Sequence, residues 1–407
     1  MISFKTLYQP STRSVEASKS SRMLFERKKP FPMMTLNIKL CKLMGLWNET
    51  NLPKPCWQAV FYVASMICLY ILPGLIFIIR QEHNIHILRA VLECIAMTVY
   101  TLRFIKQAFH REELQSCYNE MQEVLTDISE NRDSAIQTLL KHLQRSAQVL
   151  VKYYLISIMS QSLLYGLIPA LASFNADELP PTVLEQDFLL FDHRSNVWIW
   201  LAVLILCLIL QYVMLLCLTI HDTFFWNTLH HISCLFKLVK MEIAQLDDCK
   251  DAEDFKEKLA TIVHHHEVCY RAARVVERAL HPVLAMLYCF CIFGMCNIMF
   301  IIYTVDDYLL IAMESFVLNY TTFLIFSFSM LGTELMESSL SVSEAIYNTQ
   351  WYTRSVNEQR LLLFMQMRSQ RVVAISAGKF FNITRATFAG AMQSAFSYFT
   401  IIQRFYG

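Results

Sequence analysis

The stretch SNVWIWLAVLILCLILQYVMLLCLTIH, residues 195–221, contains no Asp, Glu, Lys or Arg. A helix of about 20 apolar residues is long enough to cross the hydrocarbon core of a bilayer, which is about 30 Å thick. Such a long run without a charged side chain therefore predicts a transmembrane helix.

Similar runs recur along the chain. The overall composition agrees with a membrane protein, because 55% of the 407 residues are hydrophobic and only 17% are charged, whereas a soluble domain has about 25% charged residues. We therefore predict an all-α membrane protein with seven transmembrane helices. The predicted spans are residues 57–79, 90–102, 153–176, 195–221, 279–305, 315–332 and 372–403.

The second of these spans is the least apolar. Glu93 interrupts it, and Arg89 and Arg103 flank it. Long basic side chains at the ends of a span can extend to the membrane interface. We expect both arginines to do so.

Basic residues are distributed unevenly between the connections that join the spans. Lys and Arg are frequent before the first span and after the second, fourth and sixth spans, whereas the connection between the third and fourth is acidic. Cytoplasmic connections of membrane proteins carry an excess of Lys and Arg. We therefore predict a cytoplasmic N-terminus and an extracellular C-terminus, which is the opposite of receptors coupled to G proteins.

The two longest basic connections carry apolar residues at the spacing of one helix face. This periodicity predicts long amphipathic helices that extend the spans into the cytosol. We expect these helical extensions over residues 107–150 and 222–280, with turns near 130–133 and 247–254.

Residues that could support catalysis or metal binding are scarce. His264, His265 and His266 are adjacent, and neighbours on a helix point about 100° apart, so we interpret them as a solvated face. No catalytic or phosphate-binding motif occurs, and the net charge of +1 gives no indication of nucleic-acid binding. We predict no enzyme activity, no cofactor and no metal site.

Several polar residues lie at or near membrane depth, where each is costly and should face protein or water. They are Glu93, Gln161, Gln211, Asn297, Glu314 and Asn319. They could form hydrogen bonds between helices or line a small-molecule cavity, and aromatic residues nearby suit either a cavity or an interface belt. The candidate ligand-binding residues are Tyr100, Ser157, Gln161, Tyr165, Trp198, Phe316, Asn319, Tyr320 and Phe323.

The carboxyl-terminal region carries the most specific pattern. It contains SSLSVSEAIYNTQWY at 338–352, LLLFMQMRSQRVVAISAGKFF at 361–381 and TFAGAMQSAFSYFTIIQ at 387–403. These segments resemble the carboxyl-terminal region of the insect odorant receptor family, whose terminal signature is similar to the Ser-Tyr-Phe-Thr that precedes Gln403. The ending also resembles that of the related gustatory receptors, with Ser397 in place of Thr.

The resemblance implies a function and partners. Such proteins are subunits of odorant-gated, non-selective cation channels, and they form heterotetramers with a shared odorant receptor co-receptor. They lie in the plasma membrane of olfactory sensory neuron dendrites, in contact with membrane lipid, and bind a small volatile in the outer half of the helix bundle. The alternative is a seven-span receptor that signals through a cytosolic partner without conducting. We expect compact, apolar or aromatic ligands, because charged residues are scarce in the outer halves of the spans.

The resemblance also implies that the last helix is split into a cytoplasmic half and a pore-lining half, and Gly378 and residues 382–384 are plausible places for the break. The chain then divides into a cytoplasmic N-terminal segment (1–56), helices one to six with their extensions (57–333), a cytoplasmic assembly region (334–385), and the pore helix with the extracellular C-terminus (386–407).

Two candidate surfaces follow from this division. The apolar cluster of Leu361, Leu362, Phe364 and Met365 either binds another subunit or packs within its own subunit. In the terminal helix, residues three and four apart share a face, so a pore lining is predicted, with Ile401 as the hydrophobic gate. Arg404 disfavours cation passage near the outer mouth. The pore candidates are Ser394, Ser397, Ile401, Arg404 and Phe405.

Overall fold

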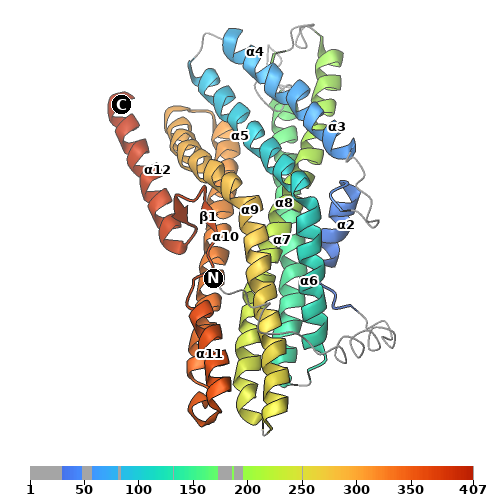
Figure 1. The fold of residues 1–407 in the computed structure, drawn as a ribbon. Helices are drawn as coiled ribbons and strands as arrows, with labels where there is room; N and C mark the ends of the chain where they lie inside the picture. The colour runs from blue at the N-terminus through green and yellow to red at the C-terminus, as the bar shows by residue number, and fades with distance from the viewer. Residues whose placement is uncertain are drawn as a thin grey trace.

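The computed structural model describes residues 30–47, 57–80, 84–131, 133–172, 186–187, 196–249 and 251–406. The described chain forms a bundle of long helices with one two-stranded hairpin beside it (Figure 1). Its elements are α2 (Thr35–Leu43), α3 (Trp57–Met66), the π-helical turn η2 (Ile67–Ile71), α4 (Leu72–Arg80), α5 (Asn84–Phe109), α6 (Arg111–Ser129), α7 (Ser134–Ala172), α8 (Val197–Ala244), η3 (Gln245–Asp248), α9 (Ala252–Thr304), α10 (Tyr308–Tyr347), η4 (Trp351–Thr353), α11 (Val356–Ser369), β1 (Ser376–Ala377), β2 (Phe381–Asn382) and α12 (Arg385–Tyr406).

The predicted apolar runs coincide with helices. The first run forms the continuous helical segment from α3 to α4, and the next five overlap α5, α7, α8, α9 and α10, with residues 173–176 of the third run outside the described residues. Among the described residues, four helical segments are long and apolar enough to cross a membrane: Trp57–Arg80, Val197–Asp248, Ala252–Thr304 and Leu310–Thr353.

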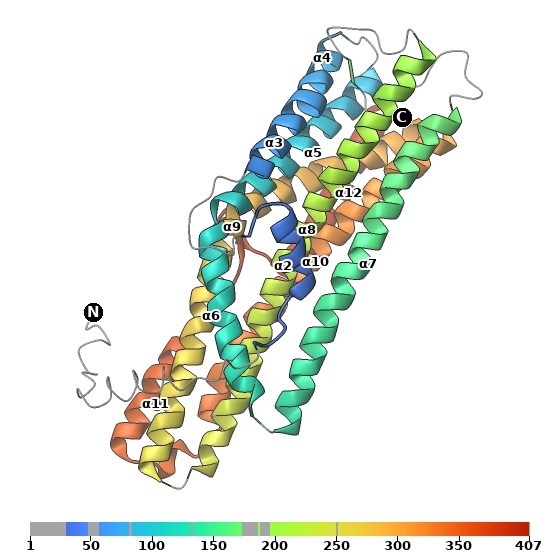
Figure 2. The same cartoon turned by 90° about the vertical axis from the view of Figure 1, so that its right-hand side faces the viewer.

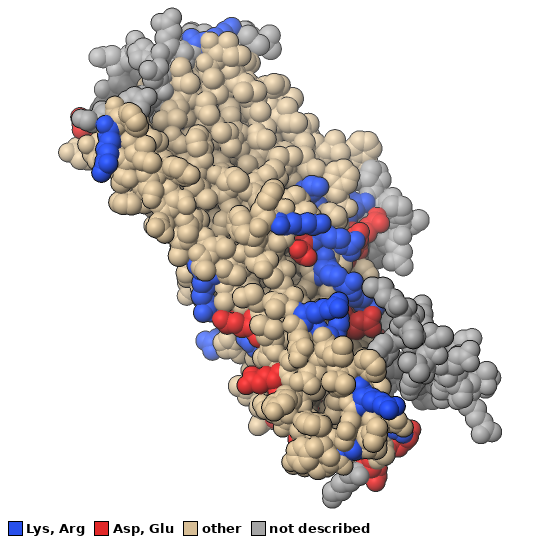
Figure 3. Space-filling view, turned by 60° about the vertical axis from the view of Figure 1, so that its left-hand side comes forward, with Lys and Arg blue, Asp and Glu red and all other residues tan. Residues whose placement is uncertain are grey.

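Charge and apolar exposure divide the molecule along its length. On the face shown in Figure 3, acidic and basic side chains gather over the lower half, and the upper half is almost free of them. Large apolar side chains are exposed in the upper half, including Phe61 on α3 and Ile79 on α4, which are 75% and 83% exposed. This arrangement fits an upper half surrounded by lipid.

The helical extensions form the lower half of the bundle. α6 ends at Ser129 and α7 begins at Ser134, while η3 and the start of α9 at Ala252 turn the chain at the far end, so both predicted turns occur. α7 runs along α8 through its length (Figure 2). The two connections are therefore packed helices, as the apolar spacing predicts.

The short helix α2 lies against α8 and is held there by buried polar contacts. Asn37 donates to Thr223 Oγ1 at 2.7 Å and accepts from Asn227 Nδ2 at 2.8 Å. Tyr118 on α6 donates to the carbonyl of Met33 at 2.7 Å. Part of the predicted N-terminal segment, residues 30–47, is thus built into the bundle, while the rest of 1–56 lies outside the described residues.

The histidine run does not form the solvated face that we expected. His265 and His266 are 3% and 4% exposed, because the extension of α9 packs against that of α8. His265 Nδ1 lies 2.9 Å from Glu242 Oε2, and the His266 ring contacts the edges of Phe236 and Tyr270. No group of metal-ligating side chains that could hold an ion occurs among the described residues.

The closing segment is interrupted before its membrane helix. The predicted seventh span begins at 372, but α12 begins only at Arg385, because the chain first forms the β1–β2 hairpin. Gly378 has a φ of +57° at the turn of the hairpin, a conformation that favours glycine. The break therefore includes Gly378, one of the predicted positions, and separates α11 from α12. The boundary expected at 333/334, between the membrane helices and the cytoplasmic assembly region, falls inside α10, which continues to Tyr347, and it stays a prediction.

The hairpin is anchored to α9 and α10 at two points. Gly378 N donates to the carbonyl of His281 at 2.7 Å, next to Pro282 inside α9. On α10, Gly332 has no side chain where the Ile383 backbone passes, and a Cβ there would collide with the Ile383 carbonyl oxygen. These contacts place α12 along the outside of the bundle (Figure 1).

The close approach at Gly332 gives a stability prediction. Gly332→Ala should lower the thermal unfolding temperature of the purified protein, because overpacking against backbone costs about 1–3 kcal/mol. Gly390→Ala on α12 is the matched control, since nothing lies within 4 Å of a Cβ there. The control should unfold no earlier than the wild type. Equal unfolding temperatures for the two variants would contradict the close packing of α10 against residue 383.

Candidate functional site

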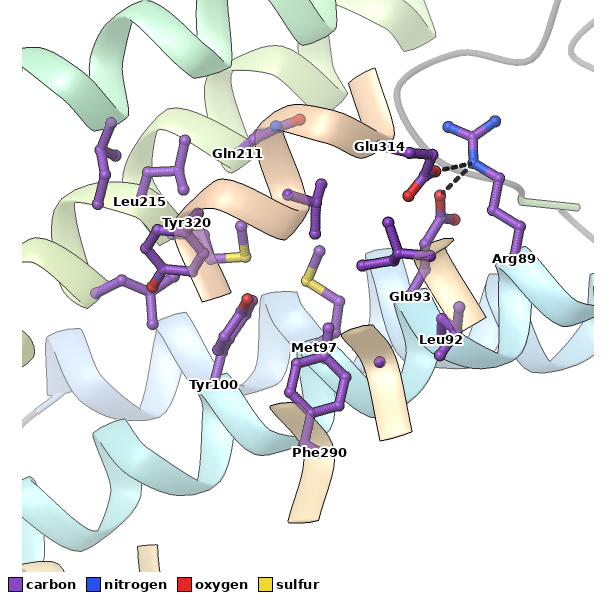
Figure 4. Close-up of a pocket in the computed structure, with 17 residues that line it drawn as sticks. Arg89, Leu92, Glu93, Met97, Tyr100, Gln211, Leu215, Phe290, Glu314 and Tyr320 are labelled. Atoms are coloured by element: carbon purple, nitrogen blue, oxygen red, sulfur yellow. Dashed lines mark ion pairs between the residues drawn. The ribbon is translucent and has the colours of Figure 1, made fainter. Parts of the chain in front are cut away.

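A cavity of about 120 Å³ lies between five helices in the upper half of the bundle (Figure 4). A protein cavity of about 150 Å³ is large enough for one benzene molecule, so this one suits a compact ligand. Its lining comprises Arg89, Leu92, Glu93, Ala96, Met97 and Tyr100 of α5, Ile158 of α7, Gln211, Met214, Leu215 and Leu218 of α8, Phe290, Gly294 and Ile298 of α9, and Glu314, Val317 and Tyr320 of α10.

The lining residues recur at helical spacing. On α9 they are four apart, at Phe290, Gly294 and Ile298, and on the other long helices they are three or four apart. Such positions form one face of each helix. The cavity therefore exists where the inner faces of the helices meet, and Gly294 leaves space because it has no side chain.

One end of the cavity is charged. Arg89 Nε lies 3.1 Å from Glu93 Oε1 and 3.4 Å from Glu314 Oε1, and the three side chains converge in Figure 4. Their exposed fractions are 12%, 16% and 8%. Arg89 therefore does not extend to the membrane interface as we expected, because the two carboxylates hold it in the bundle.

The opposite end of the cavity borders a buried ion pair. Arg103 of α5 pairs with Asp222 of α8, and both side chains are almost fully buried. Tyr154 donates to Asp222 Oδ2 at 2.7 Å, and the hydroxyl of the cavity residue Tyr320 lies 3.4 Å from that of Tyr154. Arg103 also lies 6.0 Å from the ring centre of Tyr100, another cavity residue.

Arg103, the other arginine that flanks the second span, does not extend to the membrane interface as we expected. The residue is 0% exposed, because Asp222 supplies the opposite charge inside the bundle. Sequence analysis placed Arg103 and Asp222 at the ends of two separate spans, and no local signal indicates that they meet.

The structure distributes the predicted ligand-binding residues between the cavity and the surface. Tyr100 and Tyr320 line the cavity. Trp198, Phe316 and Phe323 are 77%, 43% and 48% exposed, and Ser157 and Asn319 are also exposed. The side chains of Gln161 and Tyr165 lie outside the described residues. Aromatic content alone does not distinguish an inward face from one that faces lipid.

The polar residues at membrane depth divide in the same way. Glu93, Gln211 and Glu314 line the cavity, whereas Asn297 donates to the carbonyl of Phe293 in its own helix at 2.7 Å. Most of the apolar lining, such as Met97 and Leu218, was missed by the sequence analysis. Met97 and Leu218 could have been found from helical spacing, because they lie three or four residues from Glu93 or Gln211 on the same helix or one further turn along it.

The pore candidates lie on α12. Ser397, Ile401, Arg404 and Phe405 are exposed, and Ser394 is half-buried. On an adjoining face of the helix, Ala391 and Ala395 are buried. Within one chain, α12 therefore packs through its alanine face and presents the predicted pore face outward.

The assembly candidates lie on α11, which begins with a capping box between Ser355 and Glu358. Leu362 and Met365 are 3% and 6% exposed, and Leu361 and Phe364 are 41% and 55% exposed. The first two pack within the subunit, and the second two form an outward apolar surface. Packing within the subunit thus applies to Leu362 and Met365, and binding to another subunit stays a prediction for Leu361 and Phe364.

Comparisons with known proteins match the chain to one family. A family model described as 7tm Odorant receptor matches residues 84–396. The Odorant receptor coreceptor of Drosophila melanogaster is 31% identical over 85 residues, which are 21% of this chain and 18% of the coreceptor. Odorant receptor 85b of Drosophila melanogaster is 32% identical over 75 residues, 18% of this chain and 19% of that protein. The aligned segments span less than a fifth of either relative.

The fold is similar to a solved receptor. The structure of the insect olfactory receptor OR5 from Machilis hrabei in complex with eugenol has a TM-score of 0.75 and 16% identity, and the match covers 91% of this chain and 97% of that chain. A second structure of that receptor also has a TM-score of 0.75, with 15% identity. The similarity confirms the predicted all-α membrane fold with seven transmembrane helices.

The buried ion pair gives a prediction for stability. Asp222→Asn should lower the free energy of unfolding by about 3–5 kcal/mol, because it leaves the Arg103 guanidinium buried without its counter-charge. The change is measured by denaturant unfolding of the purified protein. The double variant with Arg103→Met is the control, since it removes both charges, and it should recover most of the loss. A double variant as unstable as Asp222→Asn would exclude the charge as the cause.

Proposed function

The chain belongs to the odorant receptor family, a family of receptors rather than enzymes, and from this premise we propose that it is the odorant-binding subunit of a ligand-gated, non-selective cation channel. Its partner is the odorant receptor co-receptor, in a heterotetramer in the plasma membrane of olfactory sensory neuron dendrites. The N-terminus is cytoplasmic and the C-terminus extracellular. A small volatile, bound in the outer half of the bundle, opens the channel.

The observation that carries this proposal is the cavity between α5, α7, α8, α9 and α10. It has a mainly apolar lining with a few polar groups, which is the usual composition of a small-molecule site. A ligand there would contact helices that are joined by side-chain packing and by ion pairs such as Arg89–Glu314. Its binding would therefore change how these helices pack against one another.

Contacts at the inner end of the cavity support a route from ligand to channel. Tyr320 and Tyr100 contact the cavity, and both neighbour the Arg103–Asp222 pair. A ligand that moves either ring would change the environment of a buried charge, whose interactions are strong because little water is present. α10 also extends from the cavity to Thr333, whose hydroxyl accepts from Arg385 N at the start of α12 at 2.9 Å.

The exposed faces of α12 and α11 support the assembly. In the proposed channel, Ser394, Ser397 and Ile401 of this chain face the pore together with the terminal helices of the other subunits, and a ring of apolar side chains excludes water when the pore is closed. Leu361 and Phe364 of α11 are the exposed apolar residues available for contact with a neighbouring subunit.

Direct recording tests the proposed function. The chain and the co-receptor are co-expressed, and excised patches without GTP are exposed to a panel of compact aromatic volatiles. We expect rapid cation current. Gly294→Val should raise the half-activating concentration at least tenfold, because the added side chain enters the cavity. Phe293→Leu is the matched control on the exposed side of the same turn, where Phe293 is 46% exposed. A response that appears only with GTP would favour signalling through a cytosolic partner.

Accessibility of Ile401 tests the pore. In channels that contain Ile401→Cys and the co-receptor, a charged thiol reagent applied from outside should change the current during odorant exposure. The reaction should be slower without odorant if the residue lies at or below the constriction. Ala391→Cys is the control, because Ala391 is 4% exposed against the bundle and should not react. Surface-expressed Ile401→Cys channels that are insensitive in both states would remove Ile401 from the pore.

A further inference from the structure

The charges that line the cavity do not balance. Among the described lining residues, Glu93 and Glu314 carry two negative charges and Arg89 carries one positive charge. Both carboxylates lie near the same guanidinium nitrogen, at 3.1 and 3.4 Å. Counted over the described lining residues, the charged end of the cavity therefore has a net formal charge of −1, and electrostatic interactions there are stronger than in water.

A second acceptor lies in the same lining on another helix. Gln211 of α8 is 7% exposed, and its Oε1 is buried without a hydrogen-bond partner among the described residues. Buried polar groups are nearly always hydrogen-bonded, and an exception indicates a water or ligand partner. A ligand with a donor group would satisfy this oxygen.

Two tyrosine hydroxyls at the opposite end are already engaged with the buried ion pair. The Tyr154 hydroxyl donates to Asp222 Oδ2 at 2.7 Å, and the Tyr320 hydroxyl lies 3.5 Å from that same oxygen. The Tyr320 hydroxyl is thereby directed toward the ion pair behind the cavity. The polar groups that remain for a ligand are dominated by acceptors at the outer end.

We propose that the cavity selects a small primary amine with a compact apolar body, whose ammonium group lies at Glu93 and Glu314. An ammonium supplies a positive charge and three N–H donors, so it balances the carboxylates and can also donate to Gln211. A carboxylic acid would add a second excess negative charge. A hydrocarbon would leave the Gln211 oxygen unpaired, at the cost of a buried polar group. The apolar body packs against Met97 and Phe290.

This inference differs from our expectation of compact, apolar or aromatic ligands. It deepens the proposed function, on which its role as an odorant site rests. The test uses benzylamine, benzyl alcohol, toluene and benzoate, which share one ring and differ in the polar group. Binding to the full chain, purified in lipid nanodiscs, is measured by calorimetry at pH 7. The same compounds are applied to cells that express the chain with the co-receptor.

Benzylamine should bind at least tenfold more tightly than toluene, with benzoate weakest. Glu314→Gln should reduce benzylamine affinity at least tenfold and leave toluene affinity unchanged. Glu93→Gln provides the same comparison if the first variant does not fold. Glu337→Gln is the matched control, since this carboxylate on α10 is 60% exposed and pairs with Arg385 outside the cavity. It should change neither affinity.

The outcomes separate the two proposals. The amine site would be overturned if toluene or benzoate bound as tightly as benzylamine or more tightly, or if benzyl alcohol bound most tightly. It would also be overturned if none of the four compounds bound, or if Glu314→Gln left the ratio of benzylamine to toluene affinity unchanged. Odorant currents together with any of these results would leave the channel function standing. Selective benzylamine binding without current in co-expressing cells would support the site and contradict the channel function.

Discussion

The Arg103–Asp222 ion pair is the constraint around which the bundle is arranged. Two charges at this depth lose the hydration of both groups, and this loss is tolerable only when each has its partner in place. Tyr154 of α7 and Tyr320 of α10 complete the surroundings of Asp222. Four helices must therefore keep one rotation and one register for the pair to form, since any other arrangement leaves a buried charge alone.

This junction separates two parts of the molecule with different properties. Toward one end, the inner faces of the helices diverge around the cavity, and its outer rim carries Arg89, Glu93 and Glu314. Toward the other end, α8 is buried on nearly all sides and carries polar groups such as Asn227 that hold α2. The cavity thus lies where packing is incomplete, next to a region where it is dense. In the proposed function, a ligand there would shift helices as rigid units, because a close-packed interior does not deform continuously.

The hairpin between α11 and α12 sets the last helix apart from the close-packed helices of the bundle. It is held by backbone contacts at His281 and Gly332, so α12 is positioned by main chain and by a narrow alanine face. Side chains such as Phe388 and Phe399 also contact α10 and α9, whereas Ser397, Ile401 and Phe405 are exposed. Glycine at position 332 therefore serves the placement of α12 as well as the packing of α10, because it lets the chain pass close to α10 just before α12 begins.

The sequence alone determined the first six apolar spans, the turns near 130–133 and 247–254, and Gly378 as a candidate for the break before the last helix, because each depends on the composition of a short local segment. The carboxyl-terminal motifs also determined the family. Only the tertiary structure decided that Arg103 reaches Asp222, that His265 is buried, and that Trp198 faces outward while Met97 lines the cavity. These outcomes depend on how each helix is rotated about its axis and which helix it crosses. A helix that is apolar on all sides gives no sequence signal for that rotation, because its inward and outward faces have the same composition.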